Sequence, residues 1–308
     1  MNFARKFSIG FPPDLKFEDW KSFVDSFHPY IHDVYSSPIG DNLYHSRMPL
    51  WQYLEHTEAN LKHFVRCISY ACSKGASFNL AINTVRLLEN NVDILNSIEL
   101  MSKYLEIDQI TTLTPYADII SKQYPDVPLL SSYNNIGYDD RFTQVVLGGK
   151  NLRDRSLFTK ISNEGFEVKL LLNNGCHFNC PGICMGKKQS TCQSVAEQNV
   201  ASNSINYLYA LQSVMPFELH DYLINFDIDL FKINSRLLYN DQLEDVMKSY
   251  IENDNQVMFP SRFLRWGSLA MFHQHIEEIE INEVMKYKEK IWAALPLESE
   301  FVSSAVTD

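Results

Sequence analysis

The stretch "TQVVLGGKNLRDRSLFTKISNEGFEVKLLLNN", residues 143–174, contains two apolar runs with an amphipathic segment between them. The runs at 143–149 and 167–174 are almost continuously apolar, as expected of parallel strands that are buried on both faces. Residues 155–165 between them have the residue pattern of a helix. This order predicts a strand, a crossover helix and a second, parallel strand.

The same pattern extends over most of the chain. Further helical segments are expected at about 17–27, 57–74, 92–105, 116–123, 217–226 and 240–252. Eight strands that alternate with helices predict an α/β fold, a single (β/α)8 TIM-like barrel. The other six strands are expected in "KFSIGF" (6–11), "YIHDVYSS" (30–37), "SFNLAIN" (77–83), "IDQITTL" (107–113), "VPLLSSY" (127–133) and "DLFKIN" (229–234).

The barrel is expected to occupy residues 1–258 and to carry a long connection at 174–216. This connection, after the seventh strand, exceeds the few residues usual for a strand-to-helix loop, and long loops in compact domains are usually functional. Residues 259–308 are aromatic-rich and become helical in pattern towards their end. We therefore expect a helical C-terminal extension and tail that pack on the barrel.

The composition is that of a globular protein with a core, since 45% of the 308 residues are hydrophobic and 21% are charged. A net charge of -11 argues against binding duplex DNA, because binding to its backbone requires clustered Lys and Arg. The N-terminus lacks the apolar stretch of a signal peptide, and no apolar run approaches the roughly 20 residues that span a bilayer. A cytoplasmic protein without a membrane span is expected.

Four of the six cysteines lie together, directly after the expected seventh strand: Cys176, Cys180, Cys184 and Cys192. In a reducing compartment, clustered cysteines favour a metal or cluster site over disulfides. Four thiolates can hold tetrahedral zinc or an iron–sulfur cluster. The spacing C-x3-C-x3-C-x7-C lacks the C-x2-C knuckle of structural zinc sites. It therefore favours an iron–sulfur cluster, with zinc as the alternative.

Other interpretations of the cysteines stay open. The spacing loosely resembles the C-x3-C-x2-C motif of radical S-adenosylmethionine enzymes, although the last gap differs. A redox-inert set of loop thiols is a further alternative. Cys67 and Cys72 lie in a helical pattern, and buried free thiols are expected there because free cysteine behaves as a small hydrophobe.

Polar residues at the strand ends are further candidates, because barrel enzymes carry their active sites at the carboxyl ends of the strands. Arg153 and Arg236 stand out, since a guanidinium binds a carboxylate through two hydrogen bonds. For Arg153, a salt bridge that ties a loop down is an equal alternative. Lys232, inside the eighth strand, is expected to be a polar plug of the barrel, with a functional amine as the alternative. The other candidates are Asp33, Tyr35, Asn83, Arg86, Thr112, Tyr133, Asn134, Asp154, Asn173 and Asn174.

Three motifs occur in order at expected strand ends: "NLRD" at 151–154, "NNGCHFNCP" at 173–181 and "FDIDLFKINSR" at 226–236. In these motifs the chain resembles the U-thirty-two, or collagenase-like, peptidase family, in its short barrel-only branch. That branch includes the iron–sulfur subunits of oxygen-independent ubiquinone hydroxylation. The resemblance covers roughly residues 5–255, and the "E-x-F-x-x-G" signature of the larger members is absent.

The resemblance implies a barrel that binds a four-iron, four-sulfur (4Fe-4S) cluster through the four clustered cysteines, of which Cys176 and Cys180 match the family motif directly. It further implies oxygen-independent hydroxylation, or a related modification, of an aromatic, RNA or biosynthetic substrate. We expect Arg236, Arg153 and Asn174 to be catalytic and the substrate to be small and anionic or aromatic. A non-catalytic cluster- or zinc-binding subunit, paired with a related barrel protein, is the alternative. A true peptidase is not expected, because the chain has no Ser/His/Asp or H-E-x-x-H signature.

Overall fold

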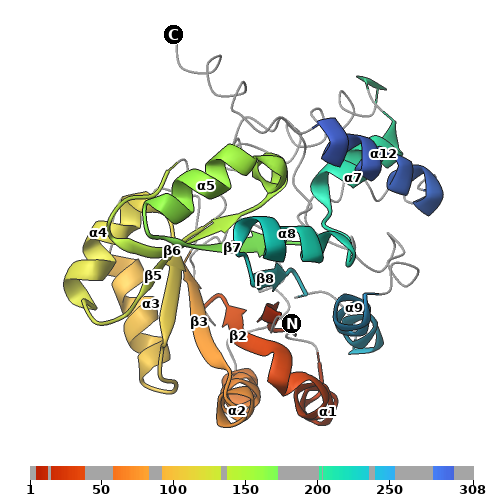
Figure 1. The fold of residues 1–308 in the computed structure, drawn as a ribbon. Coiled ribbons are helices and arrows are strands. Elements are labelled where there is room, and N and C mark those ends of the chain that lie inside the picture. The colour runs from red at the N-terminus through yellow and green to blue at the C-terminus, as the bar shows by residue number, and fades with distance from the viewer. Residues whose placement is uncertain are drawn as a thin grey trace.

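The computed structural model describes residues 5–12, 15–38, 58–82, 92–132, 137–172, 201–202, 204–235, 240–253 and 280–294. Within them, eight parallel strands close into a barrel in sequence order, and β8 pairs with β1 (Figure 1). The predicted (β/α)8 barrel is therefore confirmed. The strands are β1 (Lys6–Gly10), β2 (Ile31–Ser36), β3 (Ser77–Ile82), β4 (Gln109–Thr112), β5 (Leu129–Ser131), β6 (Phe142–Leu147), β7 (Glu167–Leu171) and β8 (Leu230–Ile233).

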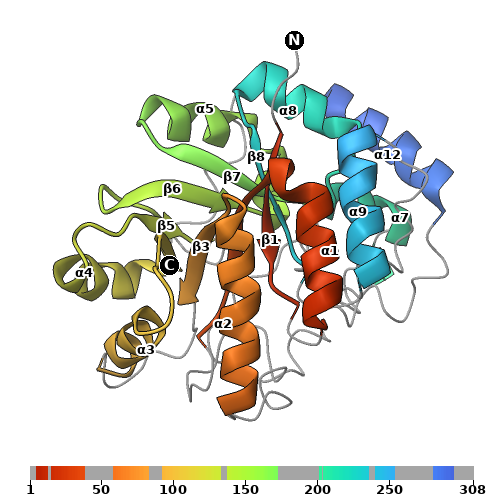
Figure 2. The ribbon, with the colours of Figure 1, turned by 90° about the horizontal axis from the view of Figure 1, so that it is seen from below.

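Helices lie around the outside of the barrel (Figure 2). Every helical segment predicted within the barrel is present, and its ends differ from the predicted ends by at most three residues. The sequence does not predict α7 (Ile205–Gln212), which lies within the long connection 174–216. The other barrel helices are α1 (Phe17–Phe27), α2 (Glu58–Ser73), α3 (Val92–Ser102), α4 (Thr114–Gln123), α5 (Arg155–Asn163), α8 (Glu218–Phe226) and α9 (Asn240–Glu252).

The main apolar core lies between the strands and the helices, because alternate residues of each strand face outward. Helix α1 illustrates the helical side of this packing. Trp20, Phe23, Val24 and Phe27 recur at three- and four-residue spacing, so they share one face, and all four are buried. Trp20 also donates from Nε1 to the carbonyl of Cys67 in α2 (2.8 Å). Apolar packing and this hydrogen bond together hold α1 against α2.

Three helix-to-strand turns place a residue in the left-handed backbone region. Gly75 (φ 97°) follows α2 and Gly165 (φ 87°) follows α5, and glycine has no Cβ to oppose this conformation. Asp227 (φ 55°) follows α8, and Asp adopts this region more readily than most residues. These turns end the helices and lead directly into β3, β7 and β8.

The C-terminal extension contains α12 (Ile281–Ala294), which packs beside α7 (Figures 1 and 2). The rings of Tyr207 and Tyr287 lie 5.4 Å apart, and the backbone N–H of Glu280 donates to Oδ1 of Asn206 (2.8 Å). The predicted helical extension is confirmed here, whereas its predicted start at 259 lies outside the described residues. None of the helices that the structure describes is long and apolar enough to cross a lipid bilayer.

Candidate functional site

The cysteine stretch begins where β7 ends. Leu171 lies opposite Lys232 in the pairing of β7 with β8, and the backbone N–H of Leu172 donates to the carbonyl of Lys232 (2.9 Å). The four clustered cysteines therefore follow a carboxyl strand end, where barrel enzymes carry their active sites. The predicted ligands Cys176, Cys180, Cys184 and Cys192 and the predicted catalytic residues Asn174 and Arg236 lie outside the described residues.

The chain returns to the same strand end after the cysteine stretch. It runs through α7, and the backbone N–H of Val214 then donates to the carbonyl of Leu172 (2.9 Å). Tyr250 of α9 donates its hydroxyl to the carbonyl of Val214 (2.6 Å). Leu172 and Val214 are therefore two hydrogen-bonded ends of a segment that contains all four clustered cysteines.

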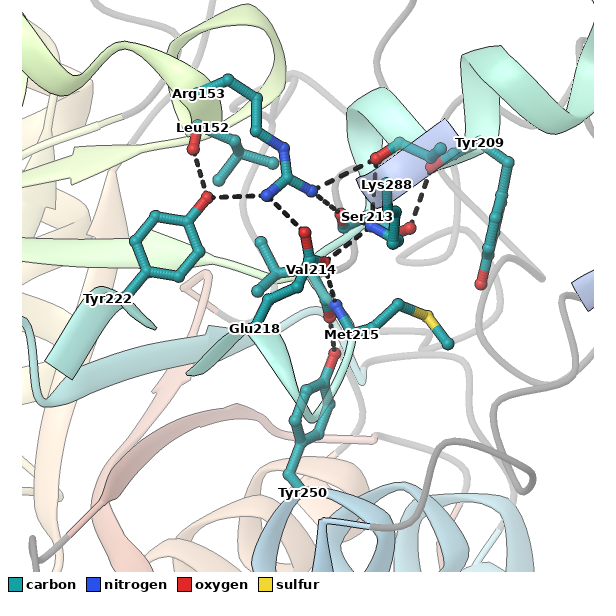
Figure 3. A network of polar contacts seen from close by, with 11 residues as sticks. Leu152, Arg153, Tyr209, Ser213, Val214, Met215, Glu218, Tyr222, Tyr250 and Lys288 are labelled. Atoms are coloured by element: carbon teal, nitrogen blue, oxygen red, sulfur yellow. Dashed lines mark hydrogen bonds and ion pairs between the residues drawn. The ribbon is translucent and has the colours of Figure 1, made fainter. Parts of the chain in front are cut away.

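Arg153 lies at this end of the barrel and binds the returning chain (Figure 3). Its side chain comes from the 3-10 helix η3 (Gly149–Arg153) and is 7% exposed. Nη1 lies 2.6 Å from Oε1 of Glu218 and donates to the hydroxyl of Tyr222 (3.0 Å). Nη2 donates to the carbonyls of Ser213 (2.6 Å) and Ala210 (3.2 Å). These contacts match the interpretation in which Arg153 ties a loop down, while a role in binding a substrate carboxylate stays a prediction.

Glu218, the first residue of α8, also binds a lysine of the C-terminal helix. Nζ of Lys288 lies 2.7 Å from Oε2 of Glu218 and donates to the carbonyls of Ala210 (3.0 Å) and Ser213 (2.8 Å). Oε2 accepts the backbone N–H of Met215 as well (2.6 Å). Carbonyls at the carboxyl end of a helix carry partial negative charge, so cations placed there stabilise the end of α7.

Arg153, Glu218 and Lys288 form what we call the Glu218 network, in which one carboxylate contacts two cations. Burial raises the pKa of Glu218, but the two cations outweigh burial and hold this pKa below its ordinary value. Burial lowers the pKa of Lys288 to about 7, although Glu218 acts in the opposite direction. Burial also opposes the charge of Arg153, yet Glu218 holds the Arg153 pKa above its ordinary value. Lys288 is therefore the cation of this network that loses its proton first.

Asp154, which the sequence places among the pocket residues, caps α5. Its Oδ1 accepts the backbone N–H of Leu157 (3.0 Å) and the hydroxyl of Ser156 (2.9 Å). The first N–H groups of a helix have no partner within it, and an Asp at the N-cap satisfies one of them. The carboxylate of Asp154 thus fixes the start of the helix that follows Arg153.

Replacing Asp154 by Ala is expected to lower the free energy of unfolding by about 1 kcal/mol, because the cap of α5 is lost. Asp154→Ser keeps a capping oxygen and should remain close to the wild type in stability. Urea unfolding followed by circular dichroism measures both variants. Equal losses in the two variants would contradict the capping role.

A buried polar cluster lies inside the barrel. Nζ of Lys169 in β7 lies 2.8 Å from Oδ2 of Asp33 in β2, and these strands are not neighbours, so the contact crosses the interior. Oδ1 of Asp33 accepts from the hydroxyl of Ser8 (2.6 Å) and the amide of Asn79 (3.5 Å). Thr111 donates to Oδ1 of Asn79 (2.8 Å). We call these five residues the lumen cluster; none is more than 2% exposed, whereas barrel interiors are usually filled by branched apolar side chains.

Asp33 and Tyr35 are predicted to follow the second strand, but both lie within β2. Burial raises the pKa of Asp33, yet the charge of Lys169 and the hydrogen bond from Ser8 outweigh burial and hold this pKa below its ordinary value. The carboxylate is therefore ionised near neutral pH and balances the charge of Lys169. Asp33 is part of the barrel interior rather than of a strand-end pocket.

Lys232 lies beside the lumen cluster, opposite Ser8 in the pairing of β8 with β1. Its Nζ lies 3.7 Å from the centre of the Tyr35 ring, a favourable position for a cation. Tyr35 in turn donates its hydroxyl to the carbonyl of Ile233 (2.9 Å). Lys232 is only 7% exposed, which agrees with the polar plug, and its use as a functional amine stays a prediction.

The two cysteines within the described residues are free, as predicted. Cys67 is buried and Cys72 is partly buried, both in α2. Burial raises the pKa of Cys67 to about 12 and that of Cys72 to about 11. Both thiols therefore stay protonated near neutral pH, whereas the thiolate is the form that binds metals. Among the residues that the structure describes, no three His, Cys, Asp or Glu side chains gather closely enough to hold a metal ion.

Three residues that matter most here are absent from the candidates taken from the sequence: Lys169, Glu218 and Lys288. Two of them leave a readable signal. Lys169 interrupts the apolar run of its strand, and Lys288 falls on one face of α12 with Val284 and Ile291, at four- and three-residue spacing. A charged residue on a buried stripe requires a buried partner. Glu218 has no such signal, because acidic residues are common in the first turn of any helix.

No family model and no curated protein matches this chain. Solved structures of similar shape include a candidate dihydrodipicolinate synthetase from Pseudomonas aeruginosa, at 8% identity over 99% of this chain and 94% of that one, with a TM-score of 0.43. Another is the GH20 β-N-acetylhexosaminidase from Streptomyces coelicolor, at 10% identity over 96% of this chain and 70% of that one, with a TM-score of 0.46. Likenesses at this level say nothing about activity, and the barrel assignment rests on the strand pairing.

Proposed function

We propose that this chain is an iron–sulfur barrel enzyme that resembles the U-thirty-two peptidase family, with a 4Fe-4S cluster held by the four clustered cysteines. One observation carries the proposal. The segment with these cysteines leaves the carboxyl end of β7 at Leu172 and is joined back to Leu172 by Val214. The segment that carries the donor set therefore starts and ends at the end of the barrel where active sites lie, and four thiolates are suitable ligands for such a cluster.

When bound, the cluster would either transfer an electron or act as a Lewis acid towards the substrate through one of its irons. The chain would provide the binding groups around it. Arg236, just after β8, would hold the carboxylate of a small anionic co-substrate through two parallel hydrogen bonds. Asn174, two residues before Cys176, would orient the substrate through its amide. Tyr35 and Lys232, which are buried in the barrel interior, would keep water from reaching the site through that interior.

The proposed reaction is an oxygen-independent hydroxylation, or a related modification, of an aromatic, RNA or biosynthetic substrate. In the hydroxylation the anionic co-substrate would supply the oxygen atom in place of molecular oxygen and would itself be reduced. A reducing compartment, the cytoplasm, would keep the four thiols free of disulfides and available to the cluster. The net charge of -11 suits a small substrate or a nucleic-acid loop better than a duplex.

Anaerobic purification followed by iron, sulfide and zinc analysis and a visible spectrum tests this proposal. We expect about four iron and four sulfide ions per chain and a brown protein, as the cluster requires. Cys176→Ala and Cys180→Ala should each lose the brown absorbance, because each removes a ligand. Cys72→Ala, the matched control in α2, should keep it.

Two results would contradict the proposal in different ways. A colourless protein with one zinc ion and no sulfide would exclude the iron–sulfur enzyme and point to the zinc-binding subunit. A cluster that persists in both Cys176→Ala and Cys180→Ala would show that the ligand assignment is wrong.

A further inference from the structure

We infer that Glu218 is a positioning residue for the cysteine stretch and that the C-terminal helix α12 contributes to the same positioning through Lys288. The inference rests on the proposed function, because the residues that Glu218 holds in place end the stretch that carries the proposed cluster ligands. In this assignment Glu218 acts through the backbone that its network contacts and is not a catalytic residue. It acts on residues 210–215, the part of the chain that rejoins β7.

The backbone of this returning segment is bound from two sides. On one side, Arg153 and Lys288 donate to the carbonyls of Ala210 and Ser213, and Glu218 accepts the N–H of Met215. On the other side, Val214 is bound through its N–H to β7 and through its carbonyl to α9. A shift of the segment in either direction would break hydrogen bonds on both sides. These hydrogen bonds therefore fix the position of the segment at the end of β7 more precisely than apolar packing alone would.

Three elements far apart in the sequence supply the charges of the network. Arg153 comes from η3, Glu218 from α8 and Lys288 from α12, and Figure 3 shows their side chains converging on the carbonyls at the end of α7. Buried ion pairs add little stability compared with well-packed apolar side chains, so stability alone does not account for this arrangement. Hydrogen bonds between charged groups are short and restrict the relative orientation of the two groups, and that property suits a positioning role.

The full-length chain, purified anaerobically, can be compared with Glu218→Gln and Lys288→Met. Gln keeps the size of Glu218 and an acceptor for Met215 but removes the charge that both cations contact. The matched control is Lys286→Met, because Lys286 lies on the same helix with 64% of its side chain exposed. Two quantities are measured: the rate at which iodoacetamide alkylates each cysteine, resolved by mass spectrometry, and hydrogen exchange in residues 204–218.

Alkylation of the four clustered cysteines should become about ten-fold faster in Glu218→Gln, since the loss of one charge-assisted hydrogen bond changes a local opening equilibrium by about that factor. Lys288→Met should change the rates in the same direction. Cys67, buried in α2, serves as the internal reference and should not change. Lys286→Met should match the wild type.

Unchanged alkylation in both variants overturns the inference. Faster hydrogen exchange in residues 204–218 with unchanged alkylation also overturns it, because the network would then only stabilise α7. If the wild type contains no iron and sulfide, the proposed function fails, yet alkylation of the same thiols still decides whether Glu218 positions them. If Glu218→Gln does not fold, the comparison of Lys288→Met with Lys286→Met decides.

Discussion

Lys169→Met is expected to lower the free energy of unfolding by about 3–5 kcal/mol, because it leaves the Asp33 carboxylate buried without its cation. Nζ of Lys169 lies 2.8 Å from Oδ2 of Asp33, and both side chains are 0% exposed. Ser8 and Asn79 would still donate to Oδ1 of Asp33, but neutral donors do not replace a positive charge. Urea unfolding near neutral pH measures the loss.

Two controls separate the ion pair from other effects of the substitution. Lys122→Met removes a lysine from an exposed pair with Asp118, 73% and 59% exposed, and should leave the stability close to that of the wild type. Asp33→Asn combined with Lys169→Met removes both charges and should recover most of the loss, because replacing a buried pair as a whole is often nearly neutral. A double variant no more stable than Lys169→Met would place the cause in packing.

The loss in Lys169→Met should also depend on pH. In the wild type the pKa of Asp33 lies below its ordinary value, so its contribution is present above the unfolded pKa of about 4 and is lost as pH falls through the folded pKa. In the variant, burial without a cation raises the Asp33 pKa, so stability falls as pH rises above about 4. The difference between the two proteins should therefore widen from pH 4 to pH 7.

The barrel is predictable from the sequence because each strand and helix follows from a local pattern. Residues 167–172 are apolar apart from two charged residues, and a helix must cover a strand that is buried on both faces. Helix α7 escapes the same reasoning, since "INYLYALQ" is short and almost uniformly apolar and has no polar face to reveal its period. Asp33 is misplaced for a related reason: an apolar run shows that a strand exists but not where it ends.

The candidate site is less predictable, because its contacts join distant parts of the chain. Arg153 is an arginine that follows a predicted strand, and this position correctly predicts that it lies at the carboxyl end of the barrel. Its partner Glu218 lies 65 residues later, and Lys288 lies 135 residues later, in a helix whose place on the barrel no local pattern reveals. Cysteine spacing predicts a donor set, whereas the hydrogen bond from Val214 to Leu172 that brings the segment back follows from the fold.

The stability of the wild type relative to Lys288→Met is expected to rise by about 2 kcal/mol between pH 7 and pH 9. Burial lowers the pKa of Lys288 from 10.5 to about 7. Between these two values the unfolded chain holds a proton that the folded chain has released, so stability increases with pH. Met has no proton to release, and the difference between the two proteins therefore isolates Lys288. Urea unfolding at a series of pH values measures it.

The titratable groups around Lys288 set the pH range in which the change in stability comes from Lys288 alone. Glu218 stays ionised above neutral pH, since its pKa is held below the ordinary value, and Arg153 stays charged. Burial raises the pKa of Tyr209, Tyr222 and Tyr250, so these tyrosines would lower stability as pH rises above about 10, which is why the series ends at pH 9. Lys286→Met, on the exposed side of α12, should follow the wild type. Parallel curves for the wild type and Lys288→Met would mean that Glu218 outweighs burial and keeps Lys288 charged, so that the network holds the returning chain with three full charges.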